Sequence, residues 1–273
     1  VYSCRDKVFV RINPLDGKKV WEKKFHRSLS GKFALTGASS PHDTLLVATD
    51  DNKLHALDPA TGKEKWKIDL MTAGFKVGPD GTIYTQQYDG KQKFVALTPD
   101  GKEKYKFPFN GHIEGIKFPD NSGAIIYENG DNTIIALNPD GSKLWQVKGN
   151  DVECFPQDPL HVFILTEKYL PDPKNPAWRS LNYMVSAHDP KTGEKKWEKL
   201  FTLINFMGET DGRLYVSEPR HLHCLNRDTG ETLWTKEGNH LKVKAVGNDG
   251  TLFIGTAEGI EAVDPATGNT MSV

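Results

Sequence analysis

The chain has 273 residues, which is long enough to bury a sizeable core within one large domain or two. Its formal charge of −1 at pH 7 argues against the basic surface of a nucleic-acid-binding protein, so we expect no nucleic-acid partner. No apolar run approaches the roughly 18 residues of a membrane-spanning helix, and we expect no direct membrane insertion.

A turn that ends on an aromatic residue recurs along the whole chain. The copies include INPLDGKKVW at 12–21, LDPATGKEKW at 57–66 and LNRDTGETLW at 225–234. The aromatic residues follow one another at steps of 45, 39, 40, 52 and 37 residues, and they are Trp21, Trp66, Tyr105, Trp145, Trp197 and Trp234. Five of the six tryptophans occupy this one position, so the chain is built from internal repeats.

Each repeat reads as four short strands. In the second repeat, alternating and β-branched residues predict strands at 32–37, 44–50, 53–58 and 63–70. The first repeat has only three, because its innermost strand would precede Val1, and the outer strand of the seventh barely begins. We therefore predict an all-β fold, a β-propeller of four-stranded antiparallel blades over residues 1–273. Seven blades are favoured over six with a shared blade, in a single domain cut from a longer protein.

The chemistry of the recurring turn explains its composition. The Asp58 carboxylate can accept backbone N–H groups across the turn, and Pro59 presets φ. Gly62 supplies the positive φ needed to enter the next strand. Trp66 then begins the outermost strand, where its ring can cover the seam between neighbouring blades. The six repeated aromatic residues are therefore assigned a structural docking role.

The segment HALDPATGKEKW fits the pattern A-x-D-x-x-T-G-x-x-x-W, and the other copies are close or shortened versions. This resembles the docking motif of the PQQ-like (quinoprotein-type) β-propeller repeat, and the resemblance spans the chain. It implies the propeller fold. The family includes quinoprotein dehydrogenases and non-catalytic scaffolds similar to bacterial outer-membrane assembly propellers.

The residues argue against the enzymatic branch of that family. Dehydrogenases of this type hold their quinone with a vicinal disulfide and use inward acidic residues for Ca²⁺, but Cys4, Cys154 and Cys224 lie far apart. We expect no cofactor, no metal and no catalytic residue. His221 and His223 lie on one strand face, yet two ligands are fewer than zinc normally needs, and we interpret them as ordinary strand histidines.

One segment departs from the repeat. Residues 167–180, EKYLPDPKNPAWRS, add about ten residues inside the fifth repeat and are expected to form a stiff, proline-rich loop. The partner-binding residues that we predict in this segment and in loops on the same face are Tyr169, Leu170, Trp178, Arg179, Phe109 and His112. Trp178 is the tryptophan outside the docking position. The alternative to a partner-binding role is that its side chain folds back onto its own blade.

The sequence thus favours a non-catalytic module that binds another protein, within a larger bacterial protein such as an envelope scaffold or a secreted effector. The alternative is an enzyme or small-molecule-binding protein with its site at the mouth of the central channel. A sensor that dimerises through a blade edge is a third possibility. The unpaired cysteines favour a reducing compartment, the bacterial or a host cytoplasm, over the periplasm; the oligomeric state stays open.

Overall fold

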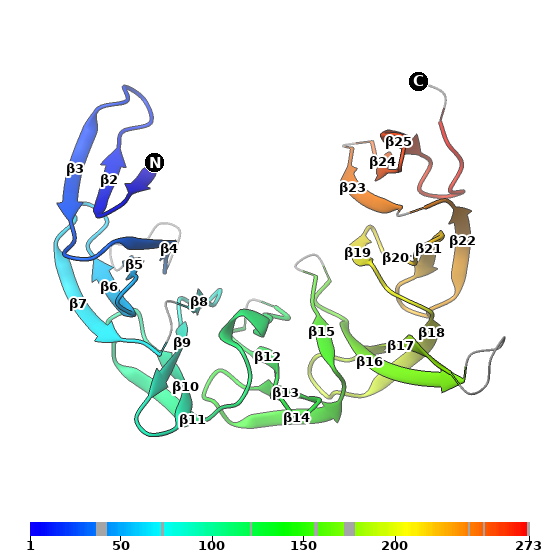
Figure 1. Cartoon of the computed structure of the whole chain (residues 1–273), viewed down its shortest axis with the longest axis horizontal. Helices are drawn as coiled ribbons and strands as arrows, with labels where there is room; N and C mark the ends of the chain where they lie inside the picture. Colours follow the sequence, from blue (N-terminus) through cyan, green and yellow to red (C-terminus); the bar gives the residue numbers. More distant parts are fainter. Residues whose placement is uncertain are drawn as a thin grey trace. The chain divides into compact units, whose positions relative to one another are not determined.

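A computed structural model describes residues 1–36, 43–71, 74–120, 122–155, 158–171, 178–239, 241–247 and 249–271 (Figure 1). These residues contain 25 β-strands and one 3₁₀ turn, and none of them belongs to an α-helix. No helix there is long and apolar enough to cross a membrane. The all-β fold class predicted from the sequence is confirmed.

The chain divides into two compact units, residues 1–130 with 137–143 and residues 131–136 with 144–273. In the first unit, one sheet has three strands and two have four, in the orders β1-β2-β3, β4-β5-β6-β7 and β11-β10-β9-β8. The bounds of these strands are β1 Tyr2–Arg5, β2 Val8–Ile12, β3 Lys19–Lys24, β4 Leu29–Leu35, β5 Leu45–Thr49, β6 Lys53–Leu57, β7 Glu64–Asp69, β8 Phe75–Val77, β9 Ile83–Tyr88, β10 Gln92–Leu97 and β11 Glu103–Pro108.

In the second unit, two four-stranded sheets, β15-β16-β17-β18 and β19-β20-β21-β22, are followed by the three-stranded sheet β23-β24-β25. The bounds are β15 Asp151–Glu153, β16 Val162–Pro171, β17 Arg179–His188, β18 Lys195–Phe201, β19 Phe206–Thr210, β20 Arg213–Ser217, β21 His221–Asn226, β22 Thr232–Glu237, β23 Lys242–Val246, β24 Leu252–Gly255 and β25 Ile260–Val263. A further three-stranded sheet contains β12 (Ile125–Glu128), β13 (Thr133–Leu137) and β14 (Lys143–Lys148).

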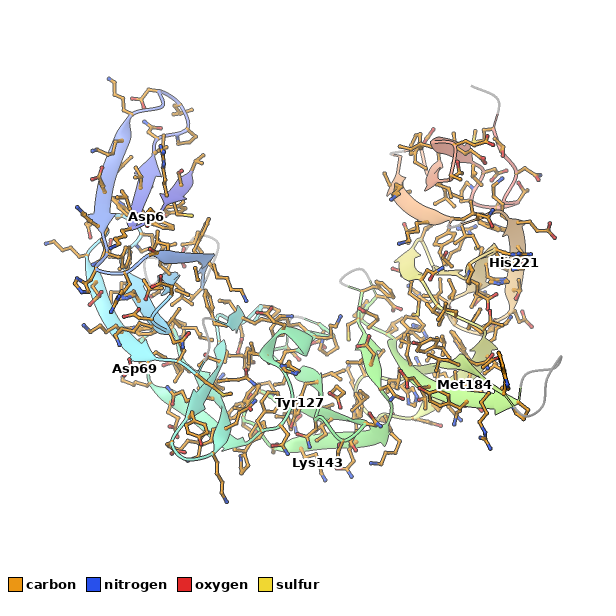
Figure 2. All side chains as sticks on the ribbon, viewed as in Figure 1. Asp6, Asp69, Tyr127, Lys143, Met184 and His221 are labelled. Atoms are coloured by element: carbon orange, nitrogen blue, oxygen red, sulfur yellow. The ribbon has the colours of Figure 1, made fainter. Side chains whose placement is uncertain are left out.

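The second sheet shows why these sequences form strands in this order. Its four strands fall within one to three residues of the predicted ranges. Every residue of β5 is buried, as expected of a strand with both faces covered. The outer strand β7 alternates exposed and half-buried residues, so it has one face toward water. Figure 2 shows the side chains of all the sheets, with Asp69 at the end of β7 labelled.

The expectation of four strands in every repeat from the second to the seventh is wrong for the fourth. Before β12, the described residues form the 3₁₀ turn η1 (Ile113–Gly115) and a single bridge between Lys117 and Ile126. Ile113 and Ile116 are buried by this compact turn, so the chain becomes extended too late to build a strand. In the last repeat the outer strand is reduced to a bridge between Val263 and Thr270.

Each repeated aromatic ring lies against the glycine of the following turn. A Cβ atom placed on that glycine would come within 2.5–2.8 Å of the ring, for the pairs Trp21–Gly62, Trp66–Gly101, Tyr105–Gly141, Trp145–Gly193, Trp197–Gly230 and Trp234–Gly268. The tryptophans also donate their indole N–H to a backbone carbonyl in that turn; Trp21 Nε1 lies 3.0 Å from the oxygen of Pro59. Glycine is therefore required at this position for close approach as well as for its φ of +72° in Gly62.

We predict that Gly62→Ala destabilises the protein more than Gly17→Ala, the matched change in the first copy of the turn. Both glycines have positive φ, so both variants share a backbone strain of about 1–2 kcal/mol. Only the new Cβ at Gly62 meets a ring, that of Trp21, because nothing lies within 4 Å of the position at Gly17. Displacing the ring adds about 1–3 kcal/mol. Urea unfolding measures the difference, and equal losses in the two variants would contradict a docking role for Trp21.

Candidate functional site

The two central strands of the fifth repeat extend beyond their sheet. β16 and β17 pair along ten residues each. Their flanking strands are shorter, because β15 pairs only with residues 163–165 and β18 only with residues 183–188. Among the described residues, 168–171 and 179–182 therefore pair only with each other. We call this two-stranded extension, together with Trp178 directly before β17, the β16–β17 arm (Figure 1).

The arm corrects the expectation that residues 167–180 form a loop. Tyr169 pairs with Leu181, Leu170 with Ser180, and Pro171 with Arg179. On the β17 side, residues 180–183 (SLNY) alternate polar and apolar and so continue the β pattern of the sheet, whereas residues 167–171 (EKYLP) on the β16 side do not alternate. Residues 172–177, with the other two prolines of the segment, lie outside the described residues.

The arm exposes large apolar side chains. Trp178, which directly precedes β17, is 70% exposed, and the exposed fractions of Tyr169 and Leu170 are 56% and 38%. Trp178 therefore does not fold back onto its own blade. The Arg179 guanidinium donates to the carbonyl oxygen of Tyr169 at 3.4 Å, which links the two strands of the arm.

Two further predicted partner residues lie in the first unit. Phe109 is only 1% exposed, with its ring 5.3 Å from the rings of Phe94 and Tyr127, so its assignment to a binding surface is wrong. Packing in this aromatic cluster removes its apolar area from water, which no sequence pattern around Phe109 indicated. His112 is exposed and directly precedes η1.

A buried group of charges connects the two four-stranded sheets of the second unit. Arg227 takes the place that proline has in other copies of the turn, and its carbonyl accepts the indole N–H of Trp197 at 2.8 Å. Its guanidinium lies 3.5 Å from an Asp158 oxygen and 3.2 Å from a Glu209 oxygen. Asp158, whose side chain is fully buried, also contacts His161 Nδ1 at 3.0 Å. These charges pair with one another between the two sheets. The packing of one sheet against the next therefore explains them.

Burial affects the pKa values of the two carboxyl groups differently. Burial raises the pKa of Glu209, whose second oxygen has no hydrogen-bond partner among the described residues. Burial also acts to raise the pKa of Asp158, but hydrogen bonds from His161 and the backbone of Leu160, with the charge of Arg227, outweigh it and hold this pKa below its usual value. The folded state therefore favours the charged form of Asp158.

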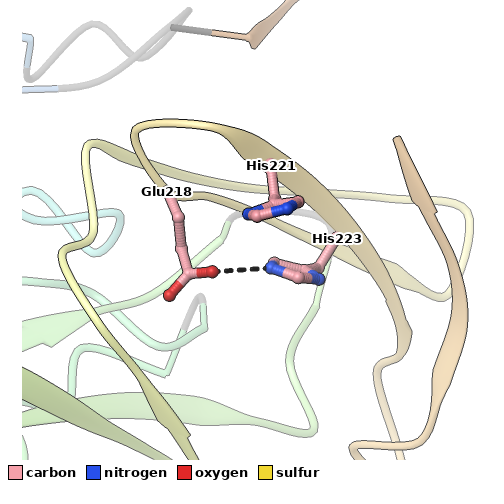
Figure 3. Close-up of side chains that lie close together, drawn as sticks. All are labelled: Glu218, His221 and His223. Carbon is pink, nitrogen blue, oxygen red and sulfur yellow. Dashed lines mark hydrogen bonds and ion pairs between the residues drawn. The ribbon is translucent and has the colours of Figure 1, made fainter. Parts of the chain in front are cut away.

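A second polar cluster lies at the turn between β20 and β21. Glu218, His221 and His223 place one ligand atom each within 4.8 Å of one another, and Figure 3 shows the three side chains converging. Sequence reasoning identified the same-face histidines but missed Glu218. The spacing Glu-x-x-His-x-His could have pointed to it, because a tight turn returns Glu218 toward the face that both histidines share.

Comparisons with known proteins agree with this architecture. The sequence matches the PQQ-like family described as outer membrane protein assembly factor BamB over residues 5–76, 69–169 and 181–271. The outer membrane protein assembly factor BamB of Nitrosomonas eutropha is 28% identical over 138 residues. That match covers 49% of this chain and 31% of the relative, so it spans about a third of the relative's length.

Solved structures share the fold. BamB from Moraxella catarrhalis aligns with a TM-score of 0.61 at 15% identity, covering 99% of this chain and 80% of that one. Quinohemoprotein alcohol dehydrogenase from Comamonas testosteroni aligns with a TM-score of 0.53 at 13% identity, covering 98% of this chain and 64% of that one. Because the sequence identities are only 15% and 13%, the similarity to these two structures shows the propeller fold alone.

We predict that Asp158→Asn lowers the free energy of unfolding by about 1.5–3 kcal/mol at pH 7, because it weakens charge-assisted hydrogen bonds at a buried site. Since the pKa of Asp158 is lower in the folded state, its contribution is complete above the unfolded-state pKa near 4 and is lost as the pH falls below it. The difference from the wild type should therefore shrink in urea unfolding below pH 4.

The matched control is Asp228→Asn, which removes a 63% exposed carboxylate that faces the same Arg227 at 3.3 Å. We expect a change of less than about 0.5 kcal/mol, because solvent screens an exposed pair. A loss for Asp158→Asn that stays constant between pH 3 and 7 would show that charge at this position is unimportant.

Proposed function

Since the chain belongs to the PQQ-like β-propeller repeat family described as outer membrane protein assembly factor BamB, we propose that it is a non-catalytic module that binds another protein through the β16–β17 arm. The observation that carries this proposal is the exposure of Trp178, at 70%, beside a strand pair that extends beyond its own sheet. The sheets form the rigid scaffold, and the arm is the contact element.

The side chains of the arm are of the types that dominate binding energy. Tryptophan, tyrosine and arginine are the residues most often found at interface hot spots, and the arm presents Trp178, Tyr169 and Arg179 together. Tyr169 and Leu170 are neighbours in a strand, so their side chains lie on opposite faces of the arm. A partner can therefore enclose the arm, with apolar contacts on both faces.

The backbone of the arm also favours a partner. A two-stranded ribbon is only marginally stable in water by itself, and no described strand pairs with either edge of the arm. A partner strand added to an edge would extend the sheet by backbone pairing, while the side chains supply specificity. Because the register of β16 and β17 already orders the arm, binding costs less conformational entropy than ordering a loop would.

Exposure alone would not single out the arm. Tyr88, at the end of β9, is 65% exposed, but the neighbouring strand β10 pairs with β11 from Lys93 onward, so this hairpin projects no comparable ribbon. Scattered exposed apolar residues are ordinary on protein surfaces. What sets the arm apart is that three large apolar side chains lie on, or directly beside, two paired strands that no other described strand flanks.

The family is described as an outer membrane protein assembly factor, which suggests that the partner is a protein of the bacterial envelope. We propose a scaffold role in the assembly of envelope proteins, with the arm as the contact to another component. The relative from Nitrosomonas eutropha carries the name of an assembly factor, and this is the support for that setting.

We predict that the double substitution Tyr169→Ala and Trp178→Ala lowers recovery of the partner at least tenfold. The test is a cross-linked pull-down from the envelope fraction of the source bacterium, with recovered proteins quantified by mass spectrometry. The reason is the loss of two central aromatic contacts. Thermal unfolding should change little, because both side chains are more than half exposed.

Tyr88→Ala is the matched control, since it also removes an exposed tyrosine from the end of a central strand. It should leave recovery of the partner unchanged. If the arm variant recovers the partner as well as the wild type does, the arm is not the contact element. If both variants lose the partner equally, the effect is not specific to the arm.

A further inference from the structure

The turn between β20 and β21 brings three metal-ligating side chains together. Glu218 directly follows β20, and His221 and His223 lie two residues apart on β21, so both rings share one face of the strand. The ring centroids of the two histidines are 5.7 Å apart. Glu218 Oε2 lies 2.8 Å from His223 Nε2, and Figure 3 shows His221 beside this pair.

Surrounding residues orient two of the three ligands. Glu218 Oε1 accepts hydrogen bonds from the backbone N–H and the hydroxyl of Thr202, which leaves Oε2 directed at the histidines. His223 Nδ1 lies 3.0 Å from the Thr235 hydroxyl, so its Nε2 is the nitrogen directed into the cluster. Such outer contacts are what hold histidine and carboxylate ligands in position around a metal.

We propose that Glu218, His221 and His223 bind a divalent transition-metal ion, with zinc as the best match. Two imidazoles and one carboxylate form a donor set that zinc uses in proteins, with a fourth position open. Zinc at about 2.0–2.2 Å from each ligand would hold the ligand atoms about 3.4 Å apart. The ligand atoms lie within 4.8 Å of one another, so that spacing requires the His221 ring to move toward the pair and the 2.8 Å contact between Glu218 and His223 to open slightly.

The open position is accessible. His221 lines a pocket of about 450 Å³ together with Arg220, Glu237, Gly238 and Asn239, which gives an ion a path from solvent. Glu237 lies directly across from His221 on β22 and shares its face. The positive charge of Arg220 disfavours a bound cation, whereas the negative charge of Glu237 favours one. With three protein ligands, we expect zinc affinity in the micromolar range, weaker than that of a closed four-ligand site.

The site lies at the end of the sheets from which the arm projects. Thr202, which holds Glu218, follows Phe201, and Phe201 pairs with Tyr183 of β17. Tyr183 in turn pairs with Glu167, which directly precedes the arm. A bound ion would therefore tie the β20–β21 turn to the end of β18 and stiffen the rim at the base of the arm.

The test is isothermal titration of tag-free, EDTA-dialysed protein with ZnCl₂, comparing the wild type with His221→Ala. We expect one site in the wild type and at least a tenfold weaker site in the variant. His221→Ala leaves the bond between Glu218 and His223 in place, so the fold should be retained, which thermal unfolding without metal verifies. His26→Ala, which removes an exposed histidine of the first unit, should bind as the wild type does.

Two further measurements test whether zinc binds specifically at these three residues. Zinc should raise the melting temperature of the wild type and of His26→Ala but not that of His221→Ala, because only a ligand bound to the folded state stabilises it. Mg²⁺ should not compete, since it prefers all-oxygen sites. Equal zinc affinity in the wild type and His221→Ala, or no melting shift with excess zinc, would overturn the proposal.

Discussion

The structure depends on the contact between an aromatic ring and the glycine of the next turn. A four-stranded sheet such as β4–β7 has a central strand, β5, that is buried on both faces, so no sheet can be stable without neighbours. The ring of Trp21 on Gly62, with its bond to the carbonyl of Pro59, joins two successive sheets at one defined position. Five further copies repeat the contact, which is why the chain repeats one turn of nearly constant sequence.

A scaffold of repeated joints tolerates departures from the repeat, and our two proposals rest on such departures. The β16–β17 arm extends two strands beyond their sheet, and the β20–β21 turn gathers Glu218 with two histidines. Both departures lie at the connection between the second and third strands of a sheet: the arm lengthens that connection, whereas the β20–β21 turn keeps a short connection and differs in its side chains. Arg227 is a departure of another kind, because it keeps the docking carbonyl while its side chain pairs buried charges across the seam. Loops on a rigid scaffold can vary in this way without loss of the fold.

The candidate site was predicted less completely than the fold. Sequence reasoning correctly placed the irregular segment at 167–180, because its length and composition break a regular repeat. It missed that the segment forms strands, since three prolines suggest a loop and strand pairing depends on the facing residues of β17. It also placed Phe109 on the surface, although a buried and an exposed phenylalanine after a strand look alike until their neighbours are known.

The sequence by itself determined the all-β class, most of the strands and the recurring turns, because these rest on local chemistry: the alternation of side chains, the carboxylate of Asp58 and the positive φ of Gly62. Only the tertiary structure decided that Trp178 is exposed, that Phe109 is buried and that Glu218 meets His221 and His223. Each of these depends on the distance between side chains that folding brings together. Burial and ligand geometry are properties of that packing, and no periodicity along the chain encodes them directly.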